Sequence, residues 1–181
     1  MGLSRPLPIF LIGMMGSGKS TIGRALARKF ERPFHDLDRE IEARSGVSVA
    51  TIFELEGETG FRKREAQVLD ELSQQEAVVI ATGGGAVLAA ENRERLRSRG
   101  LVIYLQSTLD ELARRTANDR SRPLLQGVDR RARLEQLTRE RQALYEATAH
   151  LTFQSGAANP RRLVKRIAEH PAVQQAIGTE G

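Results

Sequence analysis

The sequence contains no cysteine, and aromatic residues make up only 4% of its 181 residues. The absence of cysteine excludes disulfide bonds, thiol catalysis and metal sites with cysteine ligands. No apolar run approaches the roughly 20 residues that a membrane span needs, because the longest runs, 7–15 and 78–81, are only strand-sized. The first residues also lack the apolar core and small-residue cleavage site of a signal peptide. We therefore expect a cytoplasmic protein that has no membrane partner.

Lysine is scarce as well, since 4 of the 28 basic residues are lysines and the other 24 are arginines, against 23 acidic residues. Guanidinium groups suit bidentate contacts with phosphate and carboxylate. The arginine excess is compatible with nucleic-acid binding, with small anionic substrates, or with a surface that has no functional content. Few aromatics are available to stack on bases, and the arginines are scattered along the chain, so we expect no nucleic-acid partner. The histidines are too isolated to form a metal ligand set: His35, His150 and His170.

Short apolar segments alternate with amphipathic ones, without internal repeats, over a length that fits a single domain, 1–181. The apolar segments show no alternation, which predicts strands buried on both faces in a mostly parallel sheet between helices. Ligands bind beyond the carboxyl ends of such strands. The expected strands are 8–12, 33–36, 78–81, 101–105 and 151–153. The expected helices are 20–30, 38–45, 48–55, 61–75, 92–99, 109–117, 130–149 and 160–169, with a frayed tail from 178.

A phosphate-binding motif, G-x-x-x-x-G-K-[ST], begins at Gly13 and ends at Ser20, between an expected strand and an expected helix. Its glycines let backbone N–H groups turn toward an anion, and the following helix directs its positive end at the same point. Lys19 can reach the β- and γ-phosphates, and the Ser20 hydroxyl can ligate Mg²⁺. The motif therefore predicts a nucleoside triphosphate and Mg²⁺. The predicted ATP-binding residues here are Gly13, Met14, Met15, Gly16, Ser17, Gly18, Lys19, Ser20 and Thr21.

Three features indicate a second substrate near the γ-phosphate. Asp36 and Asp38 follow the second strand, and alternation places both carboxylates on one side if the strand continues through them. They could hold Mg²⁺-bound water or accept a hydroxyl proton, although Asp38 could instead cap the next helix. Arg62 follows a glycine-containing break at the start of a helix, where it could equally be a solvated cation. The glycines at 83–85 offer exposed backbone donors, or form a plain turn.

Taken in order, these blocks resemble the sequence motifs of the shikimate kinase family. The resemblance extends from about residue 9 to about residue 167, and the ordered set is far more specific than the phosphate-binding motif alone. The matching segments are Gly13 to Gly23, Asp36-Leu37-Asp38, Gly57 to Arg62 with Glu65, Thr82 to Val87, Arg122-Pro123-Leu124-Leu125, and Arg141 with Leu144 and Tyr145.

The resemblance implies ATP-dependent phosphorylation of the 3-hydroxyl of shikimate, on the pathway to chorismate and the aromatic amino acids. It implies a three-layer α/β/α P-loop kinase fold with a five-stranded parallel sheet. It further implies a shikimate-binding region at about 33–63 and a mobile lid at about 118–129. The expected partners are ATP and shikimate, with Mg²⁺ as cofactor, and such a chain can work as a monomer.

The resemblance also implies roles for individual residues. The carboxylate of shikimate suits guanidinium forks, and its hydroxyls suit a carboxylate and backbone groups. The implied catalytic residues are Lys19, Asp38 and Arg122. The implied shikimate-binding residues are Asp38, Arg62, Gly83, Gly84, Gly85 and Arg141. The implied metal ligands are Ser20 and Asp36, while Arg115 would lie against adenine and Arg122 would also contact ATP.

Two other functions remain open from the residues alone. Another small-metabolite kinase, such as a gluconate kinase, would share the phosphate-binding motif and the lid. The aspartate pair, Arg62 and the triple glycine together favour shikimate over that alternative. A regulatory or nucleic-acid-binding NTPase would account for the basic composition, but the scarcity of aromatics and the scattered arginines argue against it.

Overall fold

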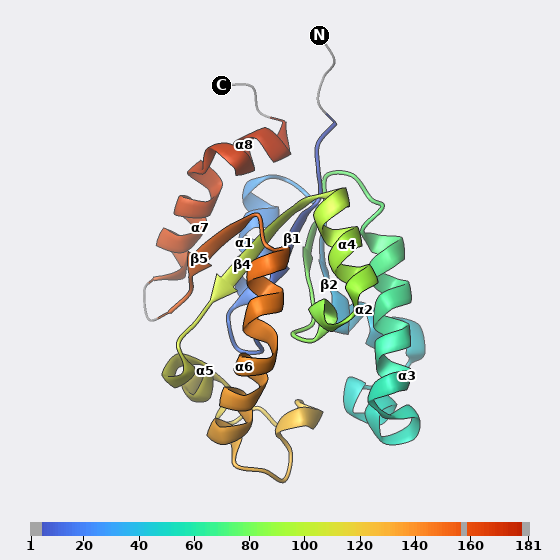
Figure 1. The fold of residues 1–181 in the computed structure, drawn as a ribbon. Helices are drawn as coiled ribbons and strands as arrows, with labels where there is room; N and C mark the ends of the chain where they lie inside the picture. The colour runs from blue at the N-terminus through green and yellow to red at the C-terminus, as the bar shows by residue number, and fades with distance from the viewer. Residues whose placement is uncertain (1–4, 157–158, 179–181) are drawn as a thin grey trace.

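The computed structural model describes residues 5–156 and 159–178. Five strands form one parallel sheet in the order β2-β3-β1-β4-β5 (Figure 1). The five-stranded parallel sheet expected from the sequence is thus confirmed. The strands are β1 (Ile9–Ile12), β2 (Phe34–Asp36), β3 (Val79–Ala81), β4 (Leu101–Gln106) and β5 (Leu151–Gln154).

Helices cover both faces of this sheet. Helices α3, α4 and α6 lie against one face, and α1, α7 and α8 lie against the other (Figure 1). Phe10 and Ile12 of β1 pack into the core on the first face, and Ile9 and Leu11 pack into the core on the second. Burial of both faces explains why the strands are apolar without alternation. The helices are α1 (Lys19–Lys29), α2 (Leu37–Ser45), α3 (Val49–Leu72), α4 (Ala90–Arg99), α5 (Leu109–Thr116), α6 (Arg130–Thr148), α7 (Pro160–Glu169) and α8 (Pro171–Ile177), with the 3-10 turns η1 (Ala86–Leu88) and η2 (Pro123–Leu125).

Of two expectations about the region between β2 and β3, the placement of Asp38 was wrong and the break at Gly57 was confirmed. Strand β2 stops at Asp36, whose carboxylate accepts from the backbone N–H groups of Asp38 and Arg39 at 3.1 and 3.3 Å and caps α2. Asp38 therefore lies in the first turn of α2, neither on the strand nor at the cap. The interruption expected at Gly57 is confirmed, because its backbone is non-helical (φ 70°, ψ −179°) and divides α3 into two helical parts. Arg62 lies beyond this break, near the start of the second part.

The last helix, α8, was not expected from the sequence. It begins at a proline, Pro171, after His170, whose Nδ1 accepts from the N–H of Ala172 at 3.1 Å. It ends at Gly178 in the left-handed conformation (φ 79°), as helices commonly do. The rest of the expected frayed tail lies outside the described residues. No helix within 5–156 and 159–178 is long and apolar enough to cross a membrane.

Candidate active site

The phosphate-binding motif forms the turn between β1 and α1. Gly13, Gly16 and Gly18 adopt positive φ angles of 146°, 81° and 95°, which residues with a side chain rarely adopt. Gly18 precedes α1 without a side-chain cap, so the first N–H groups of this helix remain available to an anion. The Nζ of Lys19 donates to the carbonyls of Gly13 and Met14 at 2.6 and 2.8 Å. The turn thus has the geometry of a phosphate site.

Lys19 is nearly buried, with 9% of its surface exposed. Burial lowers its pKa to about 7, helped by the positive charge of Arg122 and opposed by the carboxylates of Asp38 and Asp36. A buried ammonium that is held only by two carbonyls is poorly stabilised. An anionic phosphate beside Lys19 would stabilise its protonated form, so Lys19 is suited to bind a phosphate group.

A cavity of about 310 Å³ opens at the carboxyl ends of β1, β2 and β3. Parallel strands carry functional residues at this edge because all their carboxyl ends meet there. Every shikimate-binding, catalytic and metal residue expected from the sequence lines this cavity. These residues are Lys19, Ser20, Asp36, Asp38, Arg62, Gly83, Gly84, Gly85, Arg122 and Arg141, together with Met15 of the phosphate-binding motif.

The two aspartates share this cavity although they lie on different elements. Asp36 ends β2, caps α2 and accepts a hydrogen bond from the Ser20 hydroxyl. Asp38 Oδ1 is buried and has no partner among the described residues. Burial and the neighbouring carboxylate of Asp36 raise the pKa of Asp38, while Arg122, Lys19 and Arg62 lower it. A carboxylate in such surroundings is suited to accept a hydrogen bond from a substrate hydroxyl.

Arg62 is held in place by acidic neighbours on its own helix. Its Nη1 and Nη2 donate to Glu65 at 2.9 Å and to Glu58 at 3.2 Å, and its Nε has no partner among the described residues. Glu65 is fully buried, and burial raises its pKa to about 6 against the lowering effect of Arg62. No role for Glu65 followed from the sequence, although its spacing of three from Arg62 places the two on one helix face.

Arg141 differs from Arg62 because it forms no ion pair with any described carboxylate. It projects from α6 with 2% of its surface exposed, and its Nε and Nη1 have no partner among the described residues. Of the eight buried side-chain atoms without a partner in the described structure, five belong to Asp38, Arg62, Glu65 and Arg141. Unpartnered buried polar atoms are rare in native proteins. Their concentration around one cavity indicates a polar, anionic ligand.

The glycine block leaves room for these charged groups. A Cβ on Gly83 would lie 2.7 Å from Glu65 Oε2, and a Cβ on Gly85 would lie 2.2 Å from Arg62 Nη2. A Cβ on Gly84 would lie 3.4 Å from both Arg141 Nη1 and the N of Met15. Each glycine therefore permits the close approach of a neighbour, which a plain turn would not need.

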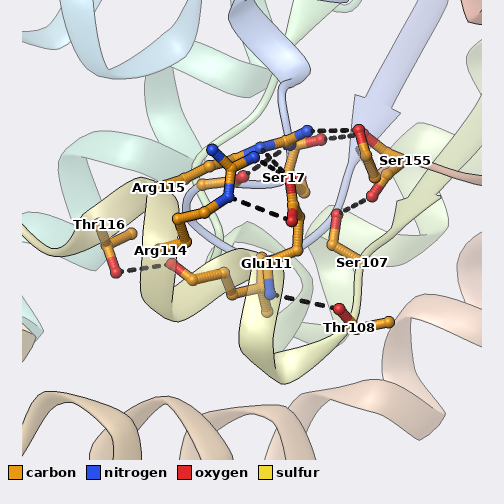
Figure 2. A network of polar contacts seen from close by, with 11 residues as sticks. Ser17, Ser107, Thr108, Glu111, Arg114, Arg115, Thr116 and Ser155 are labelled. Atoms are coloured by element: carbon orange, nitrogen blue, oxygen red, sulfur yellow. Dashed lines mark hydrogen bonds and ion pairs between the residues drawn. The ribbon is translucent and has the colours of Figure 1, made fainter. Parts of the chain in front are cut away.

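A second cavity of about 230 Å³ lies on the other side of the phosphate-binding motif, lined by Gly18, Thr21 and Arg115 together with residues from the start of α7. Figure 2 shows Arg115 and Ser155 meeting at the backbone of the motif. Arg115 donates to the carbonyls of Gly16 and Gly156 at 3.0 and 2.9 Å, and Ser155 Oγ donates to Ser17 O at 2.5 Å. Arg115 thus lies where a base attached to the phosphates could reach it.

The segment expected to be a lid covers the first cavity. Arg122, Pro123 and Leu124 line it, and Leu125 is buried in the core. Arg122 Nε pairs with Asp119 at 2.9 Å, so the guanidinium that was expected to act on phosphate is held by its own segment. The described residues contain no group of three or more histidine, cysteine or acidic side chains able to hold a metal.

Comparison with known proteins agrees with this geometry. The family model for shikimate kinase matches residues 15–171. A shikimate kinase of Bordetella pertussis (strain Tohama I) is 56% identical over 165 residues, which cover 91% of this chain and 78% of that protein. A shikimate kinase of Nitrosospira multiformis is 50% identical over 170 residues, 94% of this chain and 87% of that protein.

Solved structures give the same result. A shikimate kinase from Acinetobacter baumannii in complex with shikimate has a TM-score of 0.88 and 44% identity, covering 90% of this chain and 91% of that one. A gluconokinase from Sinorhizobium meliloti has a TM-score of 0.54 and 18% identity, which shows a shared fold alone. By its motifs, its sheet and its similarity to these relatives, the chain belongs to the shikimate kinase family.

Proposed function

We propose that this shikimate kinase holds shikimate in the first cavity and the adenine of ATP in the second, with the phosphates over the motif between them. Arg141 is the observation that carries the assignment of the first cavity. A buried guanidinium without a carboxylate partner is costly, and the carboxylate of shikimate supplies the missing partner. Arg62 already pairs with two glutamates, and its Nε has no partner among the described residues.

This assignment can be tested with a shikimate analogue whose carboxylate is replaced by a neutral amide. Arg141→Ala should lower kcat/KM for shikimate about 10- to 150-fold, the loss of a charge-assisted bidentate contact. The amide should be a poor substrate of the native enzyme, and this penalty should shrink in Arg141→Ala because the partner is already gone. Arg141→Lys should recover little, since an ammonium cannot form a planar fork.

A matched control lies two residues away on the same helix. Arg139 is exposed and pairs with Glu135, so Arg139→Ala should keep the native penalty for the amide. A penalty that is unchanged in Arg141→Ala but reduced in Arg62→Ala would assign the carboxylate to Arg62 instead.

Phosphoryl transfer needs alignment and positive charge around the γ-phosphate more than covalent chemistry. Lys19 supplies one charge from the motif, and Arg122 supplies a second once it leaves Asp119. Asp38 orients the 3-hydroxyl of shikimate and accepts its proton as the oxygen attacks. The arginine-rich cavity walls and the lid keep water from the γ-phosphate.

The residues present fit a magnesium ion. Ser20 Oγ and Asp36 are hydrogen-bonded to each other beside Lys19, and both are oxygen ligands of the type that Mg²⁺ prefers. The small number of protein oxygens is also suitable, because Mg²⁺ at nucleotide sites takes most of its ligands from phosphates and water. Mg²⁺ would there neutralise charge on the β- and γ-phosphates.

The lid is expected to be cut by trypsin in the free enzyme and protected by ATP with shikimate. Arg120 is exposed in this polar segment, whereas the bond after Arg122 precedes a proline and resists trypsin. Closure over both substrates would bury the segment. The rate of cleavage after Arg120 should be measured with each substrate alone and with both, using Arg120→Gln as a control that removes the cut. Equal cleavage in all conditions would contradict a gating lid.

One chain supplies all the residues of both cavities, which supports a monomeric enzyme. Use of ATP, a cytoplasmic metabolite, supports a cytoplasmic location. The molar mass in solution, measured by light scattering with and without substrates, tests the first of these assignments.

A further inference from the structure

The three glycines at the first cavity have all their carbonyl groups occupied by the protein. Gly83 O accepts from the N–H of Ala86 and Gly85 O from the N–H of Leu88, both at 3.1 Å. Gly84 O accepts from the hydroxyl of Tyr145 at 2.5 Å. The N–H groups of the same glycines donate to no residue in the described part of the chain. The N–H groups of these glycines are therefore free to donate hydrogen bonds to a ligand, whereas their carbonyl groups already accept hydrogen bonds from the protein.

The hydroxyl of Tyr145 fixes the orientation of one peptide group in this block. In a planar trans peptide the carbonyl and the next N–H point in opposite directions, so the Gly84 carbonyl that faces Tyr145 turns the Gly85 N–H away from it. Glycine on both sides leaves this peptide with little steric resistance to a flip. After such a flip, a carbonyl oxygen would stand where an oxygen-rich substrate requires a hydrogen-bond donor. This position is beside Arg62, because a Cβ on Gly85 would contact that side chain.

Tyr145 itself is firmly held. It is fully buried, its ring stacks on Tyr104 with centroids 5.0 Å apart, and its hydroxyl lies 3.6 Å from the sulfur of Met14 in the phosphate-binding motif. Burial raises its pKa to about 12 against the lowering effect of the neighbouring Arg141 guanidinium, so the hydroxyl stays protonated. It also follows Arg141 by four residues on α6, so one helix supplies both side chains.

We propose that Tyr145 is a positioning residue, whose hydroxyl locks the Gly84–Gly85 peptide so that the Gly85 N–H is presented to shikimate. This inference rests on the proposed function of the first cavity and adds a residue that does not itself touch the substrate. This hydrogen bond should affect the binding of shikimate and not of ATP, because the Gly84–Gly85 peptide lines the cavity assigned to shikimate.

The test compares KM values in Tyr145→Phe, which keeps the stacked ring and removes only the hydroxyl. Loss of one hydrogen bond should raise KM for shikimate about three- to tenfold, with KM for ATP and kcat changed less than twofold. A merely structural role would lower Tm and leave both KM values at the native level. Tyr104→Phe is the matched control, since the hydroxyl of Tyr104 has no hydrogen bond to the described residues, and it should keep both KM values.

Two further variants keep the test decisive. Tyr145→4-aminophenylalanine retains a donor and should restore KM for shikimate, whereas Tyr145→4-fluorophenylalanine should not; this pair replaces Tyr145→Phe if that variant does not fold. Native KM for shikimate in the variants without a donor overturns the inference. In that case, KM for shikimate in Arg141→Ala shows how much of the argument fails. A native KM in Arg141→Ala would mean that the assignment of the first cavity fails too, whereas a raised KM would mean that only the role of Tyr145 fails.

Discussion

Lys19→Met is expected to lower kcat about 100- to 1,000-fold, the effect of removing one group that stabilises a transition state. Lys19 is the only lysine among the described residues that line the cavity, and in the proposed site its ammonium faces the transferring phosphoryl group. Methionine preserves the length of the side chain but places no charge there. An assay that couples ADP release to shikimate phosphorylation measures the loss.

The same variant should fold as well as the native enzyme or better. Lys19 is nearly buried with its pKa lowered to about 7, which means that the protein accommodates the charged form at a cost. Thermal melting should therefore show a Tm at or above the native value. Lys29, on the last turn of α1, provides the control, because Lys29→Met leaves the cavity untouched and should keep native kcat. Native turnover in Lys19→Met would remove this residue from the mechanism.

Asp38→Asn is expected to lower kcat about 100- to 10,000-fold, the range that general-base catalysis contributes. The amide keeps the shape of the side chain but cannot accept the proton of the 3-hydroxyl. Stability should not fall, because the cap of α2 belongs to Asp36 and burial already disfavours the charge on Asp38. Turnover and melting must be measured on the same preparation.

Asp36→Ala is the contrasting variant for stability. It removes the cap of α2 and should cost about 1 kcal/mol, a loss that Asp38→Asn should not show. A fall in Tm with normal kcat in Asp38→Asn would mean that Asp38 serves the helix and not the reaction.

Several features of the active site follow from short-range patterns in the sequence. The phosphate-binding motif requires glycines in the left-handed region at set positions, so its residues can be identified from spacing alone. The apolar, non-alternating strands likewise predict a buried parallel sheet, and the carboxyl ends of β1, β2 and β3 then locate the site. The break inside α3 was likewise predicted, because a glycine can adopt the left-handed, non-helical backbone that Gly57 shows.

Residue patterns along the chain were enough to predict the phosphate-binding turn, the strand-helix alternation and the family to which the chain belongs. Each of these depends on residue types at fixed local spacing, and local backbone geometry obeys that spacing. Three facts came from the folded chain instead: Asp36 caps α2, Arg141 is buried without a partner among the described carboxylates while Arg62 has two, and Tyr145 reaches Gly84 across 61 residues of chain. Those facts depend on burial and on contacts between distant segments, and neither has a signature in the spacing of residues along the chain.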